Sequence, residues 1–230
     1  MIPVHDDNPT HLRPWVTWAL IGACVLTFLW QATADEAWAR AIVAGLGATP
    51  EVIFGREGGL EDPAWVPPWA TVFTSMFLHG SWAHLFGNML FLWVFGNNVE
   101  DAMGHGRFIV FYLVCGVAAV FAQALPDPAS SVPMVGASGA ISGVLGAYLL
   151  LYPKARVLLA LPPPLIFLTI GWVRAVWVLA AWFVGQVGMG WLMGLSGGGV
   201  ALGAHIGGFL AGMLLVPLFK QRHVPLWRSH

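Results

Sequence analysis

The chain has 230 residues, of which 58% are hydrophobic and only 9% are charged, and its formal net charge at pH 7 is −1. Because soluble domains carry about 25% charged residues, this composition excludes a water-soluble globular protein, and disordered chains are more polar still. The net charge leaves no basic surface that would attract nucleic acid. Long unbroken apolar runs, in place of short alternating strands, indicate an all-α polytopic membrane protein.

Six apolar runs are long enough to cross a bilayer as helices, which takes about 20 residues. In chain order they lie at about Trp15–Ala34, Ser81–Val99, Phe108–Leu125, Ala137–Leu151, Val173–Gly194 and Val200–Phe219. The stretch Val157–Ile170 is also apolar, but Pro162, Pro163 and Pro164 interrupt it and prevent a continuous helix. We interpret this stretch as an interfacial loop, with a partly inserted segment as the alternative.

The distribution of lysine and arginine predicts the orientation of the six spans. With a cytoplasmic amino terminus, only Arg40 and Arg56 of the ten basic residues lie outside, as the positive-inside rule requires. We therefore predict cytoplasmic tails at 1–14 and 220–230, a membrane domain at 15–219 in the inner or plasma membrane, and an outer loop at about 35–80. The apolar second half of that loop is expected at the interface.

Polar residues inside the spans are the candidate functional residues, because such groups are costly in lipid. The second span carries His84 and Asn88, which lie four residues apart on one helical face, the fourth carries Ser138 and the sixth carries His205. With the orientation above, His84, Ser138 and His205 each lie roughly 5–10 Å below the outer surface. Three spans thus contribute polar groups to one layer. Gln186 in the fifth span is interpreted as an interhelical hydrogen-bonding residue.

Glycine spacing predicts that the fourth and sixth spans meet. Gly139 and Gly143 in the fourth span, and Gly203 and Gly207 in the sixth, are small residues four apart, which allow two helix backbones to approach closely. Such contact would bring the Ser138 hydroxyl to the neighbouring imidazole, as a serine nucleophile requires. No Asp or Glu lies in the outer half of any span, so the pair would be a dyad.

An acyl-transfer reaction also needs donors for the oxyanion of its transition state. His84 and Asn88, together with the backbone N–H of Ser138 near a helix amino terminus, are the expected donors. Each residue alone has an ordinary structural interpretation, since intramembrane serines often bond to their own helix and polar side chains often join two helices. Their combination at one depth favours catalysis.

The sequence gives no indication of a metal, a cofactor or a disulfide. The H-E-x-x-H pattern of metalloproteases does not occur, and zinc held by His79, His84 and His205 would occupy the base. His79 is interpreted as a structural residue at the membrane edge. Cys24 and Cys115 both lie in apolar runs, where cysteine behaves as a small hydrophobic residue.

Three motifs, in order along the chain, resemble those of the rhomboid family of intramembrane serine proteases. They are His79-x4-His84-x3-Asn88, Gly136-Ala137-Ser138-Gly139 and Ala204-His205-Ile206-Gly207-Gly208. The resemblance extends over about Trp15–Phe219, and Glu100 resembles the acidic residue that closes the second helix in that family.

The resemblance implies a six-transmembrane-helix bundle that cleaves peptide bonds in or near transmembrane segments of other membrane proteins. In that reading Ser138 is the nucleophile, His205 the general base, and His84 and Asn88 form the oxyanion hole. Gly136 and Gly139 are structural residues beside the site. The expected partners are transmembrane protein substrates and the lipid bilayer, with no nucleic acid. Water would reach the site from the outer face, and substrates would enter between the second and fifth spans.

Two positions depart from the family pattern. Trp69-Ala70 stands where a Trp-Arg pair is common in the first outer loop, and Ser142 stands where some members carry an aromatic residue that packs against the histidine. Two other functions are left open. A non-proteolytic, rhomboid-like protein that binds client helices would be expected to lack Ser138 or His205. A small transporter or channel would need polar residues that continue to the inner face. The oligomeric state is not predicted.

Overall fold

The computed structural model describes the whole chain except residues 56–64, 162–163, 166–167, 195–200 and 229–230. Features of the sequence at Arg56, Pro162 and Pro163 therefore lie outside the described residues. The described chain is mostly helical, and its helices are α1 (Trp15–Ala32), α2 (Glu36–Leu46), α3 (Pro50–Ile53), α4 (Pro68–Thr74), the 3-10 helix η1 (Ser75–Phe77), α5 (Trp82–Met103), α6 (His105–Ala124), α7 (Ser138–Leu151), α8 (Ala175–Met193) and α9 (Leu202–Phe219).

The long helices coincide with the six apolar runs of the sequence, but they are not equally suited to cross a membrane. Helices α1, α6, α8 and α9 have both the length and the apolar composition of a membrane span. Helix α5 has 22 residues but carries several asparagine and acidic side chains towards its end, and α7 is apolar but has only 14 residues. The count of six spans therefore stays a prediction at α5 and α7.

Helix α7 lies at the centre of the bundle, between α5, α6 and α9. All of its residues from Gly139 to Tyr148 are buried. With a rise of 1.5 Å per residue, 14 residues extend about 21 Å, which is less than the roughly 30 Å thickness of the hydrocarbon core. A helix of this length that starts at Ser138 is therefore expected to begin below a membrane surface, as the depth argument requires.

The predicted contact between the fourth and sixth apolar runs is confirmed by the packing of α7 on α9. A Cβ atom added to Gly208 or Gly212 of α9 would collide with the backbone carbonyl of Gly139 or Gly143 of α7. Gly203 and Gly207, the two α9 glycines expected at this contact, face α6 instead, because a Cβ atom there would collide with Gln123 or Ala122 of α6. Glycine is needed at these positions because no side chain fits between the backbones.

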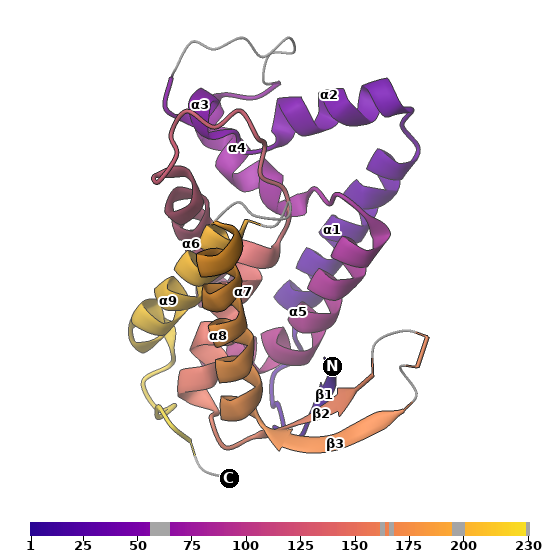
Figure 1. Cartoon of the computed structure of the whole chain (residues 1–230). Coiled ribbons are helices and arrows are strands. Elements are labelled where there is room, and N and C mark those ends of the chain that lie inside the picture. Colours follow the sequence, from indigo (N-terminus) through magenta and orange to yellow (C-terminus); the bar gives the residue numbers. More distant parts are fainter. Residues whose placement is uncertain (56–64, 162–163, 166–167, 195–200, 229–230) are drawn as a thin grey trace.

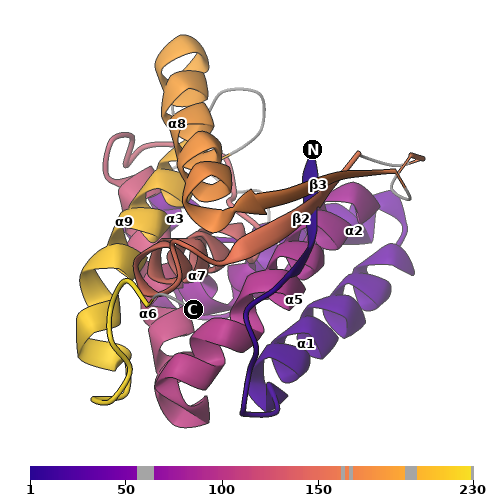
Figure 2. The same cartoon turned by 90° about the horizontal axis from the view of Figure 1, so that it is seen from below.

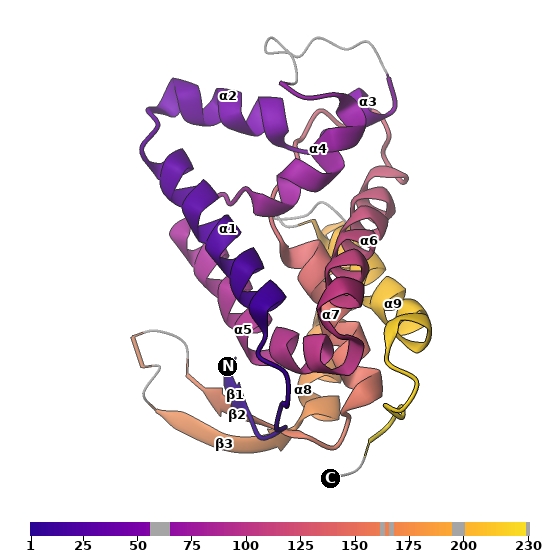
Figure 3. The same ribbon diagram turned by 180° about the vertical axis from the view of Figure 1, so that it is seen from behind.

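Glu100 explains how α1 begins without an amino-terminal capping side chain of its own. Its buried carboxylate accepts from the backbone N–H groups of Val16 and Thr17 at 2.9 and 2.8 Å, from the Thr17 hydroxyl at 2.7 Å, and pairs with His105 Nδ1 at 2.6 Å. The free N–H groups of a helix start favour a negative charge. The acidic residue of α5 thereby fixes α1 to α5, and these two helices lie side by side (Figure 3).

A small sheet corrects the expectation of a wholly helical protein. Strands β1 (Ile2–Asp6), β2 (Arg156–Ala160) and β3 (Thr169–Arg174) form an antiparallel sheet in the order β1-β2-β3. The stretch 157–170, expected to be a loop, thus supplies most of a hairpin. Of the three prolines only Pro164 is described, and it lies in the connection between β2 and β3, where a missing N–H removes no ladder hydrogen bond.

The sheet and the two chain ends lie at the end of the bundle opposite to α2, α3 and α4 (Figure 1). Figure 2 shows that β3 leads directly into α8, which stands at the edge of the bundle. The amino-terminal segment is consequently more than a short tail, since residues 2–6 are paired with β2.

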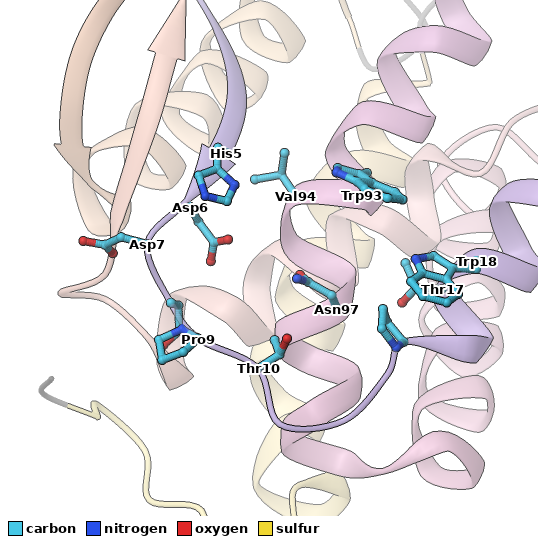
Figure 4. A pocket seen from close by; sticks show the side chains of 12 residues that line it. His5, Asp6, Asp7, Pro9, Thr10, Thr17, Trp18, Trp93, Val94 and Asn97 are labelled. Atoms are coloured by element: carbon cyan, nitrogen blue, oxygen red, sulfur yellow. The ribbon is translucent and has the colours of Figure 1, made fainter.

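Asp6 anchors β1 to the helices. Its buried carboxylate accepts from Asn98 Nδ2 of α5 at 2.8 Å and from the Tyr148 hydroxyl of α7 at 2.6 Å. Burial raises the pKa of Asp6 to about 6, although the hydrogen bond from Tyr148 and the nearby His5 oppose this rise. Figure 4 shows Asp6 beside a cavity of about 470 Å³ whose other walls include Trp18 and Trp93.

The outer loop is folded and held to the bundle. Trp65 N–H donates to the Gly45 carbonyl at 3.0 Å, the Thr74 hydroxyl donates to the Leu46 carbonyl at 2.6 Å, and Ala48 pairs with Met134 in an isolated bridge. These contacts join α2, α4 and the segment that precedes α7. The bridge at Met134 thereby ties the segment before α7 to the outer loop.

Candidate active site

The site begins with Gly136, two residues before α7. Gly136 has a φ of +123°, which side chains rarely allow, and its N–H donates to the Ser75 carbonyl at 2.8 Å. A Cβ atom here would lie 2.7 Å from Cε1 and 2.8 Å from Nε2 of His84. Glycine is therefore required both by the backbone turn and by the close approach of the imidazole.

Ser138 is the first residue of α7, and it meets His205, the fourth residue of α9. The His205 Nε2 atom lies 2.8 Å from Ser138 Oγ. Both side chains are half-buried. The glycine contacts between α7 and α9 bring the two backbones close enough for this hydrogen bond, as the spacing predicts.

His84 and Asn88 lie on the face of α5 that borders the same site. Asn88 Nδ2 is buried and, among the described residues, has no hydrogen-bond partner. A Cβ atom at Gly136 would lie 3.7 Å from this nitrogen, which places it beside the start of α7. An unpaired buried amide is costly, so it marks a position where a ligand acceptor would be stabilised.

His79 lies just before α5, and its ring contacts the ring of His84. Its backbone N–H donates to Gln31 Oε1 at 3.0 Å, its Nδ1 lies 3.2 Å from the Phe77 carbonyl, and its ring meets the His84 ring edge-on with centroids 5.2 Å apart. Burial, and to a smaller extent the neighbouring His84, lowers the pKa of His79 to about 4. His79 is thus neutral near pH 7, and its contacts with Gln31, Phe77 and His84 are those of a residue that joins neighbouring segments.

A cavity of about 640 Å³ contains the polar residues named from the sequence. His84, Asn88, Ser138 and His205 all line it. Its walls extend from these four residues to Pro50 of α3 and to the connection between α6 and α7, whose lining residues are Asp127, Ser130, Val132, Pro133, Met134 and Val135. The cavity therefore reaches from the helices towards the end of the molecule that carries α2, α3 and α4.

Gln186 of α8 has a more specific contact than the sequence indicates. Its Oε1 atom lies 2.8 Å from His205 Nδ1, so the expected interhelical hydrogen bond goes to the imidazole itself. Sequence reasoning gave Gln186 no connection with the site, because the rotation of α8 about its axis cannot be read from a uniformly apolar run. Among the described residues, no three His, Cys, Asp or Glu side chains gather as a metal site would need.

The comparison with known families agrees with this geometry. The profile of the rhomboid domain matches residues 67–222, which is more than half of the chain. This chain belongs to the rhomboid family. The matched region begins just before α4 and includes every residue of the site described above.

Several curated relatives are also rhomboid proteins. The chain is 33% identical to mitochondrial rhomboid protein 1 of Saccharomyces cerevisiae over 153 residues, which are 63% of this chain and 40% of that protein. It is 43% identical to the rhomboid protease GluP of Bacillus subtilis over 81 residues, 35% of this chain and 15% of that protein. It is 29% identical to the human mitochondrial presenilin-associated rhomboid-like protein over 157 residues, 67% and 38% of the two chains. The matches thus span less than half of each relative.

The structure accounts for the two departures from the rhomboid pattern. The Ser142 hydroxyl donates to the Ser138 carbonyl at 2.7 Å, so it packs along α7 and leaves the histidine ring free for another neighbour. Trp182 of α8 occupies that place, with its ring centroid 5.9 Å from that of His205 and an interplanar angle of 35°. In this rhomboid protein an aromatic side chain therefore faces the histidine from α8 and not from α7.

The departure at Trp69-Ala70 leaves the outer loop anchored by other means. Trp69 is 69% exposed, whereas Thr71 and Val72 of the same helix are buried. Val72 packs with Ala48 and Val120 in a small apolar cluster. Together with the hydrogen bond from Thr74 to α2, this packing holds α4 on the bundle without an arginine.

Proposed function

We propose that this protein is an intramembrane serine endopeptidase that hydrolyses peptide bonds in or near transmembrane segments of other membrane proteins. The observation that carries the proposal is the 2.8 Å contact between His205 Nε2 and Ser138 Oγ inside a cavity shared with His84 and Asn88. A serine hydroxyl becomes an effective nucleophile when a neutral imidazole accepts its proton. Membership of the rhomboid family and the similarity to the rhomboid protease GluP support the same activity.

In the proposed reaction Ser138 Oγ attacks the carbonyl carbon of the scissile bond while its proton moves to His205 Nε2. The resulting oxyanion accepts hydrogen bonds from Asn88 Nδ2, from His84 and from the Ser138 N–H. His205 then gives the proton to the leaving amine nitrogen, the C–N bond breaks, and an acyl-enzyme remains. The same imidazole then accepts a proton from water, whose oxygen attacks the ester carbon. The C–Oγ bond breaks, the imidazole returns the proton to Ser138 Oγ, and the product acid leaves as a carboxylate with loss of its proton to solvent. The unpaired Nδ2 of Asn88 supports its role as a donor.

The proposal includes six membrane spans, with residues 15–219 as the membrane domain, in the inner membrane. Four helices already have the features of spans, and α5 and α7 lie among them. Both chain ends lie at the sheet end of the bundle, where most of the lysine and arginine residues also occur, which supports cytoplasmic termini. The cavity extends to the opposite end, which supports an opening to the outer face. Substrates would enter between α5 and α8, because α8 is mostly exposed.

The test is cleavage of a single-span reporter protein in liposomes. Ser138→Ala should reduce kcat to background, a loss on the order of 10⁵–10⁶-fold, because the nucleophile is removed while its neighbours still pack. As a control for loss of a hydroxyl, Thr33→Ala, in which the lost group bonds only the preceding turn of its own helix, should keep full activity.

A second measurement separates the protease from a non-proteolytic client-binding protein. A fluorophosphonate should label Ser138 in the wild type and should not label the Ser138→Ala variant, since labelling needs an activated hydroxyl. Unchanged cleavage by the Ser138→Ala variant would rule the proposed mechanism out. Client binding without labelling of Ser138 would favour the binding protein.

A further inference from the structure

Gln186 of α8 lies against the ring nitrogen of His205 that does not face Ser138. Each ring nitrogen of His205 has one hydrogen-bond partner among the described residues: Nε2 lies 2.8 Å from Ser138 Oγ, and Nδ1 lies 2.8 Å from Gln186 Oε1. A side-chain amide oxygen only accepts hydrogen bonds, and a neutral imidazole has one N–H and one lone pair. With the amide oxygen against Nδ1, the proton sits on Nδ1 and the lone pair on Nε2 faces the serine hydroxyl.

We propose that Gln186 is a positioning residue of this site, which holds His205 in the tautomer that can accept the proton of Ser138. It takes the place that a carboxylate has in a serine–histidine–aspartate triad, where the third residue fixes the tautomer and orientation of the imidazole. This inference rests on the proposed function, because it assigns a role to Gln186 in the same reaction.

The surroundings of His205 offer no better candidate for this role. The other titratable side chains that line the cavity with His205 are His84 of α5 and Asp127 of the connection between α6 and α7. Asp127 is exposed at the outer rim, and the His84 ring contacts the Gly80 N–H through Nδ1 and the ring of His79. The two ring nitrogens of His205 are already taken by Ser138 and Gln186.

Helix α8, which carries Gln186, has few buried residues. The contact between Gln186 and His205 therefore depends on where α8 lies. Among the residues of α8, only Ala175 and Leu179 are buried, both near the junction with β3. Further along, Phe183 stacks on Phe209 of α9 at 4.6 Å, and Trp182 lies against both Phe209 and His205 at 5.9 Å. These rings place Gln186, one turn beyond Trp182, so an outward movement of α8 withdraws the acceptor from Nδ1.

A residue that only joins two helices would differ measurably from a positioning residue. Loss of an interhelical hydrogen bond lowers stability and leaves the acid–base behaviour of the imidazole unchanged. Loss of the acceptor at Nδ1 lets the proton move to Nε2, where it blocks the base. The pH dependence of kcat/KM, which reports groups of the free enzyme, therefore distinguishes the two roles.

The experiment compares Gln186→Met, Gln186→Glu and the matched control Val187→Met, a change on the same helix at a side chain that is 44% exposed. Gln186→Met should lower kcat about tenfold to hundredfold with KM unchanged, because the loss of one polar partner in a buried pair is of this size. Gln186→Glu should keep most of the activity. It should also move the acidic limb of the kcat/KM profile to higher pH by about one unit or more, since a nearby negative charge favours the imidazolium.

Wild type and Ser138→Ala are assayed in parallel with these variants, and thermal unfolding in detergent checks that each variant is folded. If Ser138→Ala cleaves as well as the wild type, the proposed function fails and the role of Gln186 fails with it. If the wild type cleaves through Ser138 but Gln186→Met keeps its kcat within about threefold, only the role of Gln186 is overturned. An equal loss of kcat in Gln186→Met and Gln186→Glu, with an unmoved acidic limb, also overturns it.

Discussion

Helices α7 and α8 both contribute to the candidate site, but they are held in opposite ways. Nearly every residue of α7 is buried, and its glycines lie against the backbone of α9. Only Ala175 and Leu179 of α8 are buried, and the rest of that helix contacts the bundle mainly through aromatic rings. Ser138 and the backbone of His205 are thus set by close packing, whereas the partner of His205 Nδ1 comes from a helix with few buried residues.

The largest expected difference between the helices is in the free energy of unfolding after a glycine on α9 or on α8 is replaced by alanine. Gly212→Ala should lower the free energy of unfolding by more than about 3 kcal/mol, because the new Cβ collides with the Gly143 carbonyl and a packed backbone cannot give way. Gly188→Ala should be neutral or stabilise by up to about 1 kcal/mol, because nothing lies within 4 Å and alanine favours a helix. Reversible unfolding in mixed detergent measures both changes. Equal destabilisation by the two variants would contradict the contrast between the helices.

The pH dependence of stability that Asp6 causes measures the contact between β1 and Tyr148 of α7. The pKa of Asp6 is raised from 3.8 to about 6 in the folded protein, so between these values the folded state binds more protons than the unfolded state. The free energy of unfolding should therefore fall as the pH rises from about 4 to about 6, by at most about 3 kcal/mol. The contribution is fully present below pH 3.8 and is lost above the folded pKa.

Asp6→Asn should remove this pH dependence, since asparagine does not titrate. Asp7→Asn is the control, because Asp7, which directly follows β1, forms an ion pair with the exposed Arg156 at 2.7 Å, where solvent screens much of its effect. Unfolding at a series of pH values measures both variants. A slope between pH 4 and 6 that persists in Asp6→Asn would assign the effect to another group.

The smallest expected effect comes from the aromatic contacts of α8. Trp182→Ala should lower kcat about fivefold and the free energy of unfolding by only about 1 kcal/mol, since ring contacts of this kind contribute about 0.5–1.5 kcal/mol. Trp177→Ala, at a side chain of the same helix that is 66% exposed, should change neither quantity. The reporter assay and detergent unfolding provide the two readouts. A loss of stability from Trp182→Ala as large as that from Gly212→Ala would show that α8 is packed as firmly as α9.

Much of this architecture could be predicted because membrane solvation acts on each segment separately. Apolar runs located α1, α5, α6, α7, α8 and α9 to within a few residues, since lipid demands such runs at each crossing. Glycine spacing predicted the contact of α7 with α9, because only glycine allows that approach. Ser138 and His205 were recognisable as polar groups in apolar surroundings, and their hydrogen bond followed from the same spacing.

The features that the sequence did not predict all depend on contacts between distant segments. The sheet joins residues 2–6 to residues 156–160, and neither segment alone has enough length or alternation to indicate a strand. Trp182 and Gln186 lie four apart on one face of α8, but that helix is so uniformly apolar that no periodicity marks the face. Ser142 showed that no aromatic side chain follows the serine by one turn, but the sequence did not indicate that Trp182 of another helix lies against the His205 ring.

The order of the strands along the chain has a consequence for biosynthesis. The register that matches Ile2 to Ala160 means that β1 leaves the ribosome long before β2 exists. At about 5–20 residues per second, the delay is roughly 10 to 30 s, during which the intervening helices are inserted. Strand β1 therefore stays without its partner until β2 has been synthesised, and α8 and α9, which carry Gln186 and His205, are synthesised later still.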